Sequence, residues 1–326
     1  MREEWQKMEE EWLAPWAARS RESKGRLRPE AECPVRTCYQ RDRDRIIHTK
    51  AFRRLMHKAQ VFLHPQSEHF RTRLTHTLEL AQIARTAARA LHLNEDLTEA
   101  IAMGHDLGHT PFGHAGERAL AELYPGFAHN KHSLRIVDHL EKDNRGLNLS
   151  FEVRDGILNH SGDQGIPQTL EGKLVRLCDR VAYLNHDIDD AIRAGLIRQQ
   201  ALPPAAMFFG ESQSERINAM VLDLVDNSRN QPLIQMSPAA AEALTELRRF
   251  MFDAVYLNPQ KLAEEQQARQ IIRDLYAYYL ENPHLLPPEH TQYPLQTSVV
   301  DYIAGMTDKF AIEHYLSIFP EKRLSL

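Results

Sequence analysis

The sequence predicts an all-α protein with a helical core and additional C-terminal helices. Apolar residues recur every three or four positions from about residue 44 to residue 195, and the alternation typical of strands is nearly absent. Breaks at 201–215 and 282–294 interrupt the later helical pattern, which closes with an apolar stretch at 299–319. We therefore predict three parts: an N-terminal arm (1–40), a helical core (41–200), and a C-terminal helical region packed on that core (201–326).

The composition fits a soluble globular protein without a general affinity for nucleic acid. The chain has 326 residues, 42% of them hydrophobic and 26% charged, and a net charge of −5, so any basic site must be local. No apolar run is long enough for a signal peptide or a bilayer span, which predicts a cytoplasmic protein without a membrane partner. Three cysteines (Cys33, Cys38 and Cys178) argue against a disulfide framework, and no second pair completes a zinc site with Cys33 and Cys38.

Residues 71–92 are predicted to form an amphipathic helix. At 100° per residue, one arc is apolar (Leu80, Ile83, Ala84, Ala87, Ala88 and Leu91), and the opposite arc is polar (Glu79, Gln82, Arg85, Thr86 and Arg89). Arg73 and His76 fall within the apolar arc, where an unpaired charge or donor costs several kcal/mol, so both need partners. Taken alone, each is best interpreted as a core histidine or a buried ion pair.

The next helix is predicted to begin at Asn94 and to end near His105 and Asp106. Asn94 is a good N-cap and is followed by acidic residues, which favour a helix N-terminus. Gly108 suits the C′ position, and Pro111 prevents the helix from continuing. We therefore expect His105 and Asp106 in the last turn of this helix.

A further helix is predicted to begin at His114, after a turn that contains His109. His114 and Glu117 are three residues apart, so they share a helix face.

Residues 169–195 are predicted to form a long helix with two distinct stripes. The apolar stripe would face the core (Leu174, Leu177, Val181, Leu184, Ile188 and Ile192). Asp179, Tyr183 and Asp187 form a second stripe, each one turn beyond the last. This polar stripe is either an ordinary solvated face or one wall of a polar cleft.

Four side chains on three predicted helices have the composition of a metal site. His76, His105, Asp106 and Asp179 supply two imidazoles and two carboxylates, which suit a divalent cation. Adjacent helical residues diverge by 100°, so His105 and Asp106 can share an ion only at the helix end. Such a site leaves positions for water and can activate it near neutral pH. The ligand set suits Mn²⁺ or Mg²⁺ best, and it is also compatible with Fe²⁺, Ni²⁺ or Co²⁺.

The motifs that carry these residues resemble a known family. "RLTHTLE", "GHDLGH" and "RLCDRVAY" follow the H…HD…D pattern of HD-domain metal phosphohydrolases. The longer strings "RDRDRIIHTKAFRRLMHKAQVF", "AMGHDLGHTPFGHAGE" and "DYIAGMTDKFA" are similar, in order, to the deoxyguanosine triphosphate triphosphohydrolase family. This resemblance implies hydrolysis of a deoxynucleoside triphosphate at the α-phosphorus, giving deoxynucleoside and inorganic triphosphate.

The resemblance also implies roles for individual residues. It places His114 as the catalytic histidine with Glu117 as its carboxylate neighbour, and it assigns the metal to the four ligands above. His114 would handle a proton as either an acid or a base, and Glu117 could fix its tautomer. Tyr183 would stack on the sugar and exclude a 2′-hydroxyl. The implied substrate contacts are Arg73, Gln60, His109, His129, Arg180, Tyr183, Asp187 and Arg54.

A basic segment could help to bind the phosphates. Residues 40–58 hold seven basic and two acidic side chains, a local charge of +5, although "RDRDR" also fits a self-paired charge run. Two alternatives stay open: another HD-domain phosphohydrolase, such as a nucleotidase or phosphodiesterase, or a scaffold that binds nucleotides or single-stranded nucleic acid. The family resemblance further implies a homo-oligomer and an allosteric nucleotide or single-stranded DNA, with apolar helices at 244–257 and 299–319 available for assembly.

Overall fold

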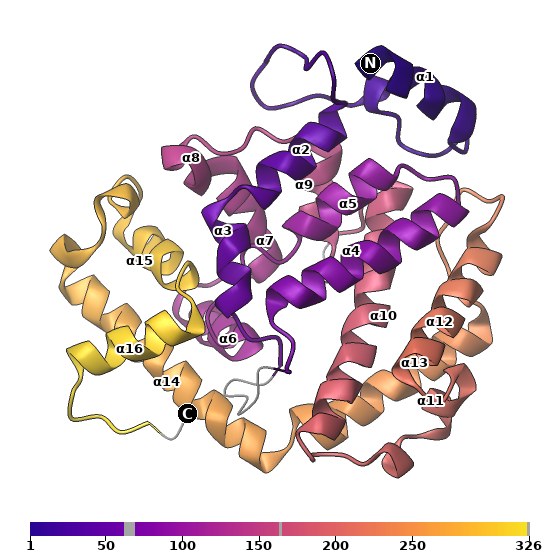
Figure 1. The fold of residues 1–326 in the computed structure, drawn as a ribbon. Coiled ribbons are helices and arrows are strands. Elements are labelled where there is room, and N and C mark those ends of the chain that lie inside the picture. Colours follow the sequence, from indigo (N-terminus) through magenta and orange to yellow (C-terminus); the bar gives the residue numbers. More distant parts are fainter. Residues whose placement is uncertain (62–68, 163–164, 325–326) are drawn as a thin grey trace. The chain divides into compact units, whose positions relative to one another are not determined.

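The computed structural model describes residues 1–61, 69–162 and 165–324, and the regular secondary structure of these residues is helical (Figure 1). Apart from two isolated β-bridges, this part of the chain forms no β-structure. The predicted all-α class is therefore confirmed.

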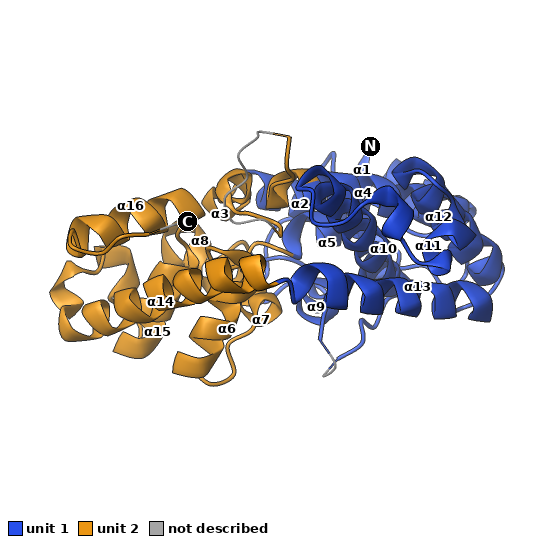
Figure 2. Cartoon of the chain, turned by 90° about the horizontal axis from the view of Figure 1, so that it is seen from below, with its two compact units in different colours: residues 1–48, 76–105, 148–258 blue, residues 49–75, 106–147, 259–326 orange. Residues whose placement is uncertain are grey.

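The chain divides into two compact units that are interleaved along the sequence (Figure 2). Unit 1 comprises residues 1–48, 76–105 and 148–258, and unit 2 comprises residues 49–75, 106–147 and 259–326. Each unit contains parts of the predicted core and of the predicted C-terminal region. The proposed assignment of roles to three consecutive ranges stays a prediction.

Unit 1 is organised around α5, a helix that is buried nearly all round. Its apolar residues face α2, α9 and α10, which pack against it, so no polar face is needed. Gly104 and Gly156 let α5 and α9 approach, because an added Cβ would lie 2.5 Å from Ile157 or 2.4 Å from Ile101. The helices of unit 1 are α1 (Arg2–Trp12), α2 (Cys38–Ile47), most of α4 (Arg73–Ala90), α5 (Glu95–Gly104), α9 (Phe151–Asn159), α10 (Leu170–Arg193), α11 (Pro204–Phe209), α12 (Gln213–Ser228) and α13 (Pro238–Met251), followed by a π-helical turn (Phe252–Tyr256).

Unit 2 has its own apolar core between α6, α14, α15 and α16. Fully buried Leu120, Ile272 and Val299 are central members of this cluster, and α6 packs along α14. The helices of unit 2 are α3 (Lys50–Arg54), the first turn of α4, α6 (Gly113–Leu123), α7 (His129–Arg135), α8 (Glu141–Asn144), α14 (Pro259–Glu281), α15 (Leu295–Ala304) and α16 (Asp308–Ile318), and a π-helical segment (Ile136–Leu140) joins α7 to α8.

The predicted helix faces agree closely with the structure. The apolar arc of α4 is buried, and its polar arc is exposed or half-buried. Asn94 caps α5 by accepting a hydrogen bond from the Leu97 N–H at 3.1 Å, as predicted. On α10 the apolar stripe is buried except for half-buried Leu177 and Ile192.

Two predicted boundaries are wrong. The 201–215 break contains the short helix α11, and the stretch at 299–319 is split between α15 and α16. Thr307 begins α16 by accepting a hydrogen bond from the Phe310 N–H, so a new N-cap interrupts the apolar pattern.

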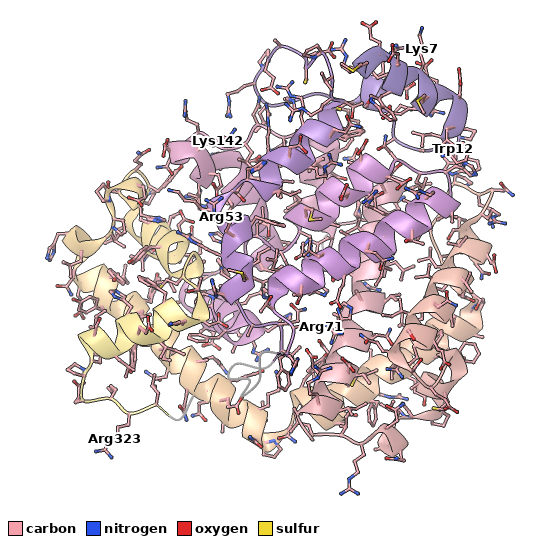
Figure 3. The ribbon with its side chains drawn as sticks, viewed as in Figure 1. Lys7, Trp12, Arg53, Arg71, Lys142 and Arg323 are labelled. Carbon is pink, nitrogen blue, oxygen red and sulfur yellow. The ribbon has the colours of Figure 1, made fainter. Side chains whose placement is uncertain are left out.

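The N-terminal arm is held to the rest of unit 1 by ion pairs. Arg26 binds Asp42 at 2.5 Å, and Arg45 binds Glu30 at 2.8 Å, which accounts for part of the basic segment as paired charges. Lys7 and Trp12 project from α1 into solvent (Figure 3). The three cysteines are free thiols, and no described helix is long and apolar enough to cross a membrane.

Candidate active site

Three of the four predicted metal ligands lie together in unit 1. His76 comes from α4, His105 caps the C-terminus of α5, and Asp179 lies on α10. Asp179 Oδ1 is 3.1 Å from His76 Nε2 and 3.9 Å from His105 Nε2. Both imidazoles are about 1% exposed, so three ligand-type atoms converge at a site shielded from bulk water. This donor set fits a divalent cation.

The end of α5 differs slightly from the prediction. The helix ends at Gly104, so His105 is the C-cap and Asp106 follows it outside the helix. Gly108 does not adopt the left-handed conformation that a C′ glycine would need. It is required for space instead, because an added Cβ would lie 2.1 Å from the backbone nitrogen of Ser133. The C′ assignment of Gly108 is therefore wrong.

Asp106 belongs to unit 2, where it holds Arg73 and His109. Arg73 Nη1 donates to Asp106 Oδ2 at 2.9 Å, and His109 Nε2 lies 3.1 Å from Asp106 Oδ1. Arg73 is 1% exposed, yet its Nε and Nη2 atoms have no hydrogen-bond partner among the described residues. Buried donors without partners are costly, so the Arg73 guanidinium is suited to bind a further acceptor.

A cluster of three imidazoles surrounds this group in unit 2. The rings of His109 and His129 stack with centroids 4.0 Å apart, and the ring of His114 meets that of His109 edge-on at 5.6 Å. Glu117 Oε1 accepts hydrogen bonds from the backbone N–H and Nδ1 of His129, each at 2.8 Å. The predicted cluster therefore forms, but the Glu117 carboxylate orients His129 instead of His114.

The environment shifts the pKa values in this cluster in different directions. Burial alone would lower the pKa of His129, but the hydrogen bond and charge of Glu117 outweigh it and raise that pKa. Desolvation and the nearby charge of Arg73 lower the pKa of His114. The His114 residue is nevertheless exposed to solvent. At neutral pH these shifts favour a charged His129 and a neutral His114.

Lys58 and Asp308 connect the loop of His109, which leads into α6 and His114, to the C-terminal helices. Lys58 Nζ donates to the carbonyl oxygens of His109 and of Ala304, the latter at 2.8 Å. Asp308 accepts from the Ala59 N–H at 2.8 Å and from the Phe112 N–H at 2.9 Å. Burial lowers the pKa of Lys58 to about 7. Sequence reasoning missed both roles, although each residue lies in a string that resembles the family.

The polar stripe of α10 is confirmed, and it has a partner that the sequence did not reveal. Asp187 is buried and accepts a hydrogen bond from the hydroxyl of Tyr256, which lies in the π-helical turn after α13. Tyr183 is half-buried one turn earlier on α10, and burial together with Asp179 raises its pKa. Arg180 is exposed.

The remaining predicted contacts lie in unit 2. Gln60 is half-buried, and its Oε1 atom is an acceptor without a hydrogen-bond partner in residues 1–61, 69–162 and 165–324. Arg54 on α3 is exposed, as is neighbouring Arg53, which is labelled in Figure 3. The basic segment is thus divided between paired arginines in unit 1 and cationic side chains of unit 2.

Comparisons with known proteins identify families and structures to which this chain is similar. Residues 73–184 match the HD domain family, and residues 234–317 match the phosphohydrolase-associated domain. A phosphohydrolase from Bacteroides thetaiotaomicron superposes with a TM-score of 0.54 at 19% identity, covering 84% of this chain and 67% of that structure. A hypothetical protein from Aquifex aeolicus gives 0.50 at 20% identity, covering 86% and 72%. The helical fold and the H…HD…D residues thus define the class of HD-domain phosphohydrolases.

Curated relatives narrow that class. A deoxyguanosinetriphosphate triphosphohydrolase-like protein from Caldanaerobacter subterraneus is 52% identical, covering 98% of this chain and 96% of the relative. A protein of the same description from Desulfatibacillum aliphaticivorans is 47% identical and is covered to 98% in both chains. This chain therefore belongs to the deoxyguanosinetriphosphate triphosphohydrolase-like family of HD-domain phosphohydrolases.

Proposed function

We propose that this protein hydrolyses deoxynucleoside triphosphates at the α-phosphorus, releasing deoxynucleoside and intact inorganic triphosphate. The observation that carries the proposal is Arg73, a buried guanidinium that binds Asp106 and has two nitrogen atoms without a partner in the described part of the chain. A cation with unused donors suits phosphate oxygens, and Arg binds them through paired N–H groups. The family relationship supplies the nucleotide part of the proposal.

His76, His105, Asp106 and Asp179 would hold the divalent cation. The first two and Asp179 converge in unit 1, and Asp106 is joined to His105 by a peptide bond. A bound divalent cation supplies Lewis-acid polarisation of water and neutralises charge on the phosphates. Mn²⁺ or Mg²⁺ suits this set of imidazole and carboxylate ligands best.

The imidazoles of unit 2 would have two roles, one in binding the phosphates and one in proton transfer. The Glu117 carboxylate raises the pKa of His129, which favours positive charge beside the ring of His109 and so suits an anionic substrate. The lowered pKa of His114 leaves its ring neutral near pH 7, so we assign it to accept the proton of the attacking water.

Tyr183, Asp187 and Gln60 would recognise the deoxyribose. Asp187 is fixed by Tyr256, and the unpartnered Gln60 Oε1 can accept from a sugar hydroxyl. Stacking of Tyr183 on the sugar would leave no room for a 2′-hydroxyl, so Tyr183→Ala should raise activity on ribonucleotides relative to deoxyribonucleotides. An unchanged ratio would refute this role. Exposed Arg180 and Arg54 would make outer phosphate contacts.

Product identification tests the proposal directly. Purified protein is incubated with each deoxynucleoside triphosphate and Mn²⁺, and the inorganic product is separated by ion-exchange chromatography. Triphosphate supports the proposal, whereas pyrophosphate or orthophosphate favours another phosphohydrolase, and binding that survives chelation without turnover favours a scaffold. His114→Ala should abolish release, and exposed His284→Ala is the matched control.

The proposal extends to assembly and regulation by analogy with the family. We expect a homo-oligomer whose activity responds to a second deoxynucleotide or to single-stranded DNA. Light scattering with and without these ligands, together with initial rates at fixed substrate, measures both expectations.

A further inference from the structure

A second buried histidine contacts the predicted ligand His76 in unit 1. His186 on α10 is 1% exposed, and its Nδ1 lies 3.3 Å from Nδ1 of His76. The other ring nitrogen of His186, Nε2, lies 3.5 Å from a carboxylate oxygen of Glu79. Glu79, His186 and His76 thus form a line of polar groups that leads to the side of His76 opposite Asp179.

The helices supply this line in a regular way. Glu79 follows His76 by three residues on α4, and His186 follows Asp179 by seven residues on α10. Spacings of three and seven residues return to the same helix face. Each helix therefore carries one predicted ligand and one supporting residue on a common face.

A bound cation selects one arrangement of protons. Two Nδ1 atoms at 3.3 Å can share one proton, so one ring donates and the other accepts. If His186 donated, its Nε2 lone pair would face the Glu79 carboxylate, and His76 would carry its proton on Nε2, where it could not bind a cation. If His76 donates, His186 carries its proton on Nε2 toward Glu79, and the Nε2 lone pair of His76 faces Asp179, which is favourable when a cation lies between them.

We propose that His186 and Glu79 are positioning residues that hold His76 in the Nδ1–H tautomer, which directs its Nε2 lone pair at a divalent cation. This inference rests on the metal site of the proposed function. Histidine ligands generally need such a partner for the second ring nitrogen, and its loss weakens metal binding. No role has been assigned above to either residue, and neither contacts the reacting atoms.

The tautomer can be measured by NMR, independently of activity. In protein labelled with ¹⁵N-histidine, the ring signals of His76 are assigned by their loss in His76→Gln. At a Mg²⁺ concentration that saturates the wild-type protein, His76 should show a protonated Nδ1 and an unprotonated Nε2. At the same concentration, His186→Phe should show a mixture or the Nε2–H form of His76, whereas exposed His139→Phe should change nothing. A wild-type His76 protonated at Nε2 in the presence of Mg²⁺, or an unchanged tautomer in His186→Phe, would overturn the inference.

Metal affinity gives the second measurement. His186→Phe should weaken Mn²⁺ binding, measured by titration calorimetry, by about 10- to 100-fold. His186→Asn should restore part of the affinity, because its amide oxygen can accept from His76 Nδ1. Glu79→Gln, at a partly exposed side chain, should weaken binding in the same direction and guards against misfolding of the core variants. Equal affinity for Mn²⁺ in the wild-type protein and all variants would contradict the positioning role of His186 and Glu79.

The two proposals fail in different ways. Absence of Mn²⁺ binding to the wild-type protein would defeat the proposed metal site, whatever the tautomer of His76. Normal Mn²⁺ binding and hydrolysis with His76 in the Nε2–H tautomer would defeat the positioning role of His186 and Glu79 and leave the proposed function intact.

Discussion

Removing the Asp308 carboxylate should destabilise the loop that contains His109 and leads into α6, where His114 lies. Asp308 is 8% exposed and accepts two backbone N–H groups, from Ala59 at 2.8 Å and Phe112 at 2.9 Å. A hydrogen bond to a charged group contributes about 1.5–3 kcal/mol. Asp308→Ala, which loses both, should therefore lower the free energy of unfolding by about 3–6 kcal/mol, and Asp308→Asn, which keeps one acceptor oxygen, by roughly half as much.

The effect should reach His114 through the backbone of Phe112. Phe112 has a φ of +63°, a left-handed conformation that costs a residue with a side chain about 1–2 kcal/mol. Its N–H is held by Asp308, and His114 follows two residues later. When that bond is lost, the strained backbone can relax, so we expect the rate of hydrolysis to fall together with stability.

Urea unfolding at pH 7 measures the stability, and release of inorganic product measures activity. The control is Glu313→Gln on the same helix, whose carboxylate is 65% exposed and lies 3.7 Å from Lys309. An exposed pair of this kind contributes under about 1 kcal/mol. An Asp308→Ala protein as stable as the Glu313→Gln control would refute the reasoning.

Three further predictions concern unit 2. Burial lowers the pKa of Lys58 to about 7, so above that pH the unfolded chain binds more protons than the folded chain. The free energy of unfolding of the wild-type protein, relative to that of Lys58→Met, should therefore rise from pH 7 to 10. The slope should reach at most about 1.4 kcal/mol per pH unit, and a flat difference in urea unfolding would contradict it. Arg73→Lys cannot serve Asp106 and a phosphate together, so KM should rise about tenfold or more with a smaller change in kcat, and an unaltered KM would argue against the phosphate role. Glu117→Gln removes the charge that raises the pKa of His129, so NMR titration should show that pKa falling, and no fall would mean that another group sets it.

The helix faces could be predicted because they depend on local periodicity. The buried arc of α4 and the capping role of Asn94 follow from spacing and side-chain chemistry within one or two turns. His76, His105 and Asp179 were grouped by residue type and motif, and the structure places them within 4 Å of a shared carboxylate oxygen. Their use as metal ligands stays a prediction.

Residues that act across long sequence separations could not be predicted from spacing. Lys58 reaches Ala304 across 246 positions, and Tyr256 reaches Asp187 across 69, so neither contact leaves a periodic signal. Gly108 shows the converse problem, because its position after a helix indicates a C′ glycine, while the structure needs it for close backbone approach. The same residue type satisfies both demands.

The partner of Glu117 shows why a helical spacing rule can select the wrong contact. Three residues separate His114 from Glu117 on α6, which predicts a pair on one face. His129, however, is the first residue of α7, and its backbone N–H is one of the donors that a helix N-terminus leaves without an internal partner. A carboxylate there satisfies that N–H and the Nδ1 of the same residue, so it gains two charge-assisted hydrogen bonds where His114 offers one. The carboxylate consequently orients His129 and raises its pKa, and the side chain of His114 stays exposed to solvent.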